Sequence, residues 1–91
     1  DLVLTESIGR KQALTINANS TDSNNWSASV RWVDESDNEF VSQSKTDIQL
    51  DTVSNDHARL YRKGPVAEVT FTSEETAGTA NSINAFVGAH R

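Results

Sequence analysis

Apolar and polar residues alternate with a period of two along much of the chain. The alternation is clearest over residues 26–34, where Trp26, Ala28, Val30 and Trp32 fall on one face and polar side chains fall on the other. Such a period predicts a half-buried β-strand, and it places both tryptophans of the chain on one side of it. The same reasoning predicts further strands over residues 2–8, 11–18, 40–46, 48–53, 58–62, 66–72 and 81–89.

Turn signals separate these segments every 8–12 residues, and none of the segments has the length or the period of a long helix. Among the turns are Gly9-Arg10 and the acidic stretch 34–39, where Asp37-Asn38 favours left-handed backbone angles and hence a hairpin. This spacing is typical of an all-β protein. We therefore predict one antiparallel β-sandwich over residues 1–91, immunoglobulin-like or jelly-roll-like, with about seven or eight short strands.

Composition narrows the class of protein. The chain has 91 residues and no cysteine, so neither disulfides nor thiolate metal sites stabilise its single core. Its net charge of −5 argues against nucleic acid, and no apolar run approaches the ~20 residues of a membrane helix. The chain starts at Asp1 and contains no methionine, which favours a processed or excised virion or secreted protein over an ordinary cytosolic enzyme.

Two charged groups of opposite sign are candidates for an interface. The acidic turn contributes Asp34, Glu35, Asp37 and Glu39, and a basic group contributes Arg59, Arg62 and Lys63. One interpretation brings them together across a subunit or partner contact, and the other treats them as ordinary solvated charges.

Carboxylates in a loop also suit calcium. An EF-hand counted from Asp34 fails, because its sixth position is Glu39 and its twelfth is Lys45. We predict no metal site and no cofactor, and a calcium ion held by Asp34, Asp37 and Glu39 is the alternative.

Three aromatic residues are candidates for exposed contacts. The residues next to Tyr61 and Phe86 in their strands are predicted to point inward, so these two rings should point outward. Trp26 lies at the start of its strand, beside a polar loop. Exposed aromatic rings would suit a sugar or a protein surface, whereas buried rings would simply fill the core. We assign Trp32 to the core.

The chain contains few groups that could act in catalysis. His57 and His90 are the only histidines, and no nucleophile elbow, zinc-helix motif or glycine-rich phosphate loop is present. A chain of this length also leaves little room for a cleft that excludes water. We therefore predict that the protein is not an enzyme.

Two segments resemble known small β-sandwich modules. Residues 32–39, Trp-Val-Asp-Glu-Ser-Asp-Asn-Glu, resemble their W-x-D-x-x-G-N hairpin, with Asp37 at the usual glycine position. Residues 64–71 and 81–86 resemble the last strands of sandwich modules in phage virion and tail-associated proteins, and of extracellular carbohydrate-binding modules. The resemblance implies a structural or adhesive role without an active site, and it carries over no functional residue.

Together these observations predict a non-catalytic binding module, in the virion or outside the cell. The more specific expectation is a virion (capsid) decoration or accessory protein that docks on a larger assembly and forms a homo-oligomer. The alternative is an extracellular carbohydrate-binding or adhesion module.

Overall fold

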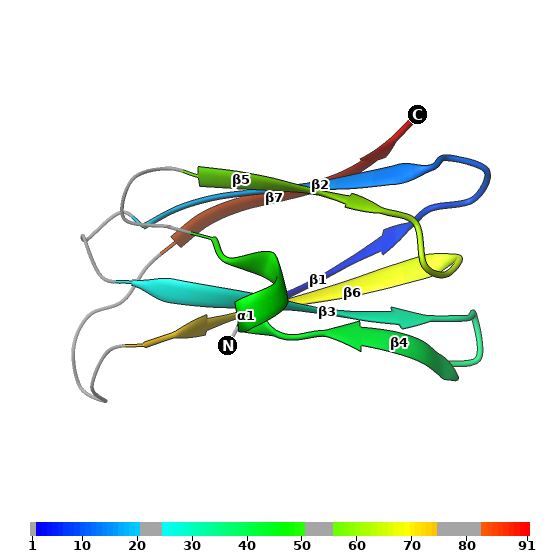
Figure 1. Ribbon diagram of the computed structural model, residues 1–91, viewed down its shortest axis with the longest axis horizontal. Helices are drawn as coiled ribbons and strands as arrows, with labels where there is room; N and C mark the ends of the chain where they lie inside the picture. Colours follow the sequence, from blue (N-terminus) through cyan, green and yellow to red (C-terminus); the bar gives the residue numbers. More distant parts are fainter. Residues whose placement is uncertain (1, 21–24, 51–55, 75–82) are drawn as a thin grey trace.

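A computed structural model describes residues 2–20, 25–50, 56–74 and 83–91, and it confirms the predicted antiparallel β-sandwich (Figure 1). Two sheets pack face to face in this part of the chain. Their strands are β1 (Leu2–Ser7), β2 (Ala13–Ser20), β3 (Trp26–Val33), β4 (Glu39–Gln43), β5 (Asp56–Tyr61), β6 (Val66–Ser73) and β7 (Ile83–His90). One short helix, α1 (Lys45–Ile48), follows β4.

The strand order is β1-β6-β3-β4 in the four-stranded sheet and β5-β2-β7 in the three-stranded sheet, and all pairs are antiparallel. The pairing of the second strand with the fifth and of the third with the sixth is that of immunoglobulin-like sandwiches. The first and last strands lie in different sheets and face each other across one side of the sandwich. There the Glu6 carboxylate of β1 accepts a hydrogen bond of 3.0 Å from the backbone N–H of Ala89 on β7.

The core lies between the two sheets, on the apolar rows that the alternation predicts. Trp32, Phe71, Ile16 and Val69 are fully or almost fully buried there. The indole N–H of Trp32 donates a 2.7 Å hydrogen bond to Oε1 of Gln43 on the neighbouring strand β4. The fully buried indole of Trp32 therefore has a partner for its one donor.

The strands predicted over residues 40–46 and 48–53 are wrong at the end of the first and the start of the second, because β4 ends at Gln43 and residues 45–48 form the single turn of α1. The Asp47 carboxylate accepts hydrogen bonds from the backbone N–H of Ser44 at 2.8 Å and from its hydroxyl at 3.1 Å. This Ser-x-x-Asp cap favours a helical turn over the strand that the alternation of Ile48 and Leu50 suggests. Both apolar residues still contact the core, and residues 51–53 lie outside the described part of the chain.

Helix α1 lies along the side of the sandwich opposite the β1–β7 contact, beside β3 and β4 (Figure 1). Ile48 is buried, and Gln49 ends the turn with a left-handed φ of 54°. The helix thus covers the side on which β4 and β5 are the edge strands. No helix within the described residues is long and apolar enough to span a membrane.

Ile16 is buried on β2, the central strand between β5 and β7, so a substitution there tests the packing of the core. Ile16→Val removes one buried methylene and is expected to lower the free energy of unfolding by about 1 kcal/mol. Val3→Ala, at a site that is 51% exposed, is the control and should change it by less than about 0.5 kcal/mol. Urea denaturation measures both, and equal losses would contradict the described core.

Candidate functional site

The outer face of the three-stranded sheet carries two strongly exposed aromatic side chains. Tyr61 on β5 is 80% exposed and Phe86 on β7 is 63% exposed. Tyr61 is in register with Ala13 of the central strand β2, and Phe86 is in register with Asn17. With four residues of offset along β2 and two strand spacings across it, the two Cα atoms lie about 17 Å apart.

Polar groups occupy the surface between these rings. Thr15 and Asn17 of β2 lie in register with Arg59 and His57 of β5, respectively. The hydroxyl of Thr15 shares a hydrogen bond of 2.5 Å with Nε2 of His90 on β7. This partly buried pair links the neighbouring strands β2 and β7 on the outer face of the sheet.

The position of the Phe86 ring depends on Gly88, two residues along the same strand. A Cβ atom at position 88 would lie 2.8 Å from Cε1 and from Cζ of Phe86, so a larger residue there would displace the ring. The ring therefore covers the backbone of β7 at the glycine. More than half of the Phe86 side chain nevertheless remains accessible.

The structure places the other aromatic residues differently from the prediction. Trp26 is only 8% exposed and belongs to the core, so its assignment as an exposed contact is wrong. Trp26 lies in the same alternating row of β3 as the buried Trp32, so its side chain points into the core although a polar loop precedes it. Phe40, which the sequence analysis missed, is 57% exposed. The β3–β4 register shifts between Trp32 and Val33, so simple alternation does not predict where Phe40 points.

The acidic stretch 34–39 forms the predicted hairpin between β3 and β4, and Asp34 organises it. One carboxylate oxygen of Asp34 accepts the backbone N–H groups of Ser36 at 2.8 Å and Asn38 at 2.9 Å, and the other accepts Nδ2 of Asn38 at 3.0 Å. These bonds lower the pKa of Asp34 below its ordinary value of 3.8, with the backbone N–H of Asn38 as the largest cause. Asp37 has a φ of 66°, which explains why glycine is usual at this motif position.

Arg31, on the outer face of β3, forms ion pairs with two carboxylates of this hairpin. Its guanidinium pairs with Asp37 at 2.8 Å and Glu39 at 3.0 Å, and it lies 3.7 Å from Glu68 on β6. The hydrogen bond to Asp37 is the main cause that raises the pKa of Arg31, and the same bond lowers the pKa of Asp37 from 3.8. The sequence analysis missed Arg31, although it occupies an outward position on the strand that leads into the acidic turn.

The predicted meeting of the acidic turn with Arg59, Arg62 and Lys63 does not occur within one chain. Among the described residues, the ion pairs of the hairpin carboxylates are with Arg31, whereas Arg59 lies on the opposite sheet. Arg62 donates from its side chain to the carbonyl of Gly9 and from its backbone to the carbonyl of Gln12 at 2.8 Å. A contact between the two groups on different copies stays a prediction.

The calcium alternative at Asp34, Asp37 and Glu39 has no geometric support. Asp34 is occupied by the hairpin's own hydrogen bonds, and the other two carboxylates pair with Arg31. The described part of the chain holds no group of three or more His, Cys, Asp or Glu side chains arranged to bind a metal ion.

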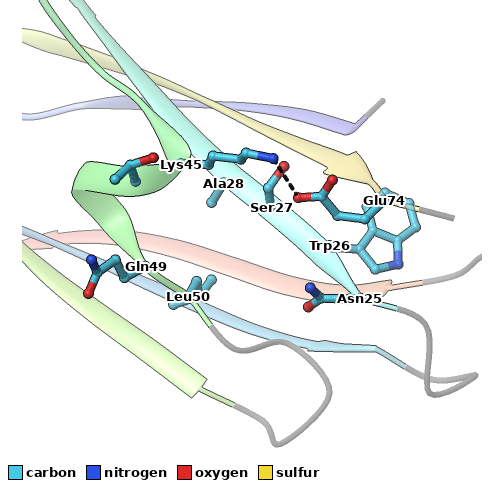
Figure 2. A pocket seen from close by; sticks show the side chains of 9 residues that line it. Asn25, Trp26, Ser27, Ala28, Lys45, Gln49, Leu50 and Glu74 are labelled. Atoms are coloured by element: carbon cyan, nitrogen blue, oxygen red, sulfur yellow. Dashed lines mark hydrogen bonds and ion pairs between the residues drawn. The ribbon is translucent and has the colours of Figure 1, made fainter.

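Two hollows of the described surface lie away from the exposed aromatic residues. One, of about 230 Å³, lies where α1 meets the start of β3, and the Lys45–Glu74 ion pair of 3.2 Å crosses it (Figure 2). The other, of about 390 Å³, is a groove on the outer face of the four-stranded sheet, lined by Ser29, Val30, Arg31, Ser42, Gln43, Ser44, Asp47, Glu68 and Thr70. Neither hollow is lined by a histidine, so neither offers the usual proton-transfer group.

Comparisons with protein-family models, with curated proteins and with solved structures give no match for this chain.

The lowered pKa values of the hairpin carboxylates predict a pH dependence of stability. Above the ordinary value of 3.8, Asp34 and Asp37 are ionised in both states and their contribution is fully present. Below it, the unfolded chain binds protons more readily than the folded one, so stability falls as the pH drops toward the folded pKa values.

Arg31→Met removes the main cause of the shift at Asp37 and should make this decline shallower, while leaving the part due to Asp34. Urea midpoints at pH 7 and about pH 3 measure the difference. Lys45→Met, which removes another exposed and paired cation, is the control and should decline like the wild type. An equally steep decline in Arg31→Met would contradict the role of Arg31.

Proposed function

We propose that the protein is a non-catalytic module that docks on a larger protein assembly through the outer face of its three-stranded sheet. We call this surface the aromatic face and define it by Tyr61, Phe86, Arg59, Thr15 and Asn17. The observation that carries the proposal is the exposure of Tyr61 and Phe86 on one sheet face. In its more specific form, the protein is a virion decoration or accessory protein.

Two physical arguments support a protein partner. Tyrosine, phenylalanine and arginine are enriched in the centres of protein interfaces, where their burial supplies much of the binding free energy. The ring of Phe86 packs over the backbone at Gly88, and the hydroxyl of Thr15 is hydrogen bonded to His90. Groups that are already fixed lose little conformational entropy on binding.

The same face also favours carbohydrate as a second candidate ligand, as in an extracellular binding or adhesion module. Amide, hydroxyl and guanidinium groups from Asn17, Thr15 and Arg59 lie between the two rings, and sugars combine apolar ring faces with many hydroxyl groups. Both candidate ligands, a protein assembly and a carbohydrate, would bind the same aromatic face.

The aromatic face predicts the behaviour of a double variant, Tyr61→Ser with Phe86→Ser. Particles from the source of the protein are stripped of this chain and incubated with purified recombinant protein, and the bound fraction is measured after sedimentation. The wild type should rebind, and the double variant should lose at least about tenfold in affinity because both aromatic anchors are gone.

Val3→Ser is the matched control, because Val3 is an exposed apolar residue on the other sheet, and it should rebind like the wild type. Unchanged rebinding of the double variant would contradict docking through this face.

Calorimetric titration with a panel of neutral and acidic oligosaccharides tests the second candidate. Calorimetry suits this test because both tryptophans are buried and their fluorescence would not report contacts at the aromatic face. Heat of binding that disappears in the double variant would favour carbohydrate. No heat across the panel, together with rebinding to particles, would favour the protein assembly.

A further inference from the structure

The described charges are divided between the two sides of the sandwich. Beside the aromatic face, and in the turns that lead into β2 and out of β5, the charged residues are basic: Arg10, Lys11, Arg59, Arg62, Lys63 and Arg91. On the hairpin, α1 and the outer face of the four-stranded sheet they are mainly acidic: Asp34, Glu35, Asp37, Glu39, Asp47 and Glu68. The net charge of −5 conceals this division.

On the acidic side, internal ion pairs leave negative charge uncompensated. Arg31 is the cation at the hairpin, where it faces Asp37, Glu39 and Glu68. One positive charge among three carboxylates leaves this end of the four-stranded sheet strongly negative. The groove of about 390 Å³ opens on the same surface, and its lining includes the carboxylates Glu68 and Asp47 beside the single cation Arg31.

On the basic side, the outward positions of β5, β2 and β7 carry no carboxylate within the described residues. Asp56, at the start of β5, belongs to the half-buried row of Ala58 and Leu60 and not to the outward row of Arg59 and Tyr61. The aromatic face is therefore positively charged locally although the protein as a whole is acidic. Its charge and its projecting side chains complement the acidic groove on the other side of the same molecule.

We propose that the occupant of the aromatic face is a second copy of this chain, which presents its acidic hairpin and groove. This inference rests on the proposed docking role of that face and names its partner. Each contact joins two different surfaces, so the association is head to tail. A dimer formed in this way keeps one free acidic groove on one copy and one free aromatic face on the other, so assembly continues until a ring closes or a filament grows.

Sedimentation velocity on the wild-type protein provides the first measurement. The mean mass should rise between about 10 µM and about 1 mM protein, a range that suits a modest interface. It should fall when salt is raised from about 20 mM to about 500 mM, because screening weakens attraction between exposed charges. A mass that stays at one chain under all these conditions would overturn the inference.

Two variants test the head-to-tail geometry. Arg59→Glu reverses a charge on the aromatic face only, and the double variant Glu35→Arg with Glu68→Gln weakens the acidic side only. Each variant alone should lose association by about tenfold or more, since every contact needs both surfaces intact. Mixed in equal amounts, they should form dimers and stop there, because the one intact aromatic face meets the one intact acidic groove.

Lys45→Glu is the opposite control: it reverses an equal charge on α1, next to the acidic groove, so it adds negative charge to the acidic side and should not weaken association. Urea midpoints confirm that each variant is folded. Association of either variant like the wild type, or absence of dimers in the mixture, would overturn the head-to-tail contact.

The two proposals fail separately. A monomeric protein whose Tyr61 and Phe86 are still needed for rebinding to particles would overturn self-association and keep the docking role. Head-to-tail association without any rebinding to particles would overturn docking on particles and keep self-association.

Discussion

The burial of the Trp32 indole is the constraint on which much of the sandwich depends. Its N–H requires the Gln43 side chain, and this ties the edge strand β4 to the core. Its cross-strand neighbour on β6 is Ala67, whose small side chain leaves room for the ring. The turn before β6 passes so close that a Cβ atom at Gly64 would lie 3.3 Å from Cβ of Trp32 and 3.2 Å from the ring of Phe40. One large residue thus determines its neighbours on β4, on β6 and in the adjoining turn.

The outward side chains of the two sheets point away from the buried Trp32, and they differ in chemical character between the sheets. On the four-stranded sheet, Arg31 and Asp34 satisfy part of the hairpin from within, and the outward side chains are mainly acidic. On the three-stranded sheet, Tyr61 and Phe86 remain exposed. The alternation of β-strands permits this separation, because inward residues stabilise the fold while outward residues can be selected for binding. The inward Glu6 on β1, hydrogen bonded to Ala89 of β7, and α1 on the opposite side protect the sandwich at its edges.

The period-two pattern predicts most of this architecture and much less of the site. It correctly indicates the core rows through Trp32 and Phe71, because burial on one face imposes the period directly. It fails at residues 45–48, where a local Ser44–Asp47 cap favours a helical turn, and at Phe40, where a bulge shifts the register. Parity alone indicates that Tyr61 and Phe86 point outward, but only the pairing of both β5 and β7 with β2 brings them onto one face. Long-range pairing of this kind depends on tertiary contacts, which a local pattern does not contain.

The pairing of strands that are far apart in the sequence has a consequence for the order of folding. The hairpin that joins β3 to β4 closes within a few residues, and Asp34 and Arg31 support it locally. In contrast, β1 pairs with β6 and β2 pairs with β7, so Ala13 meets His90 almost a full chain length away. Pairings over such distances slow folding, because the entropy of closing the long loop is lost before the contacts form. During synthesis, β2 therefore remains without one of its two neighbours until β7, far along the chain, has been made.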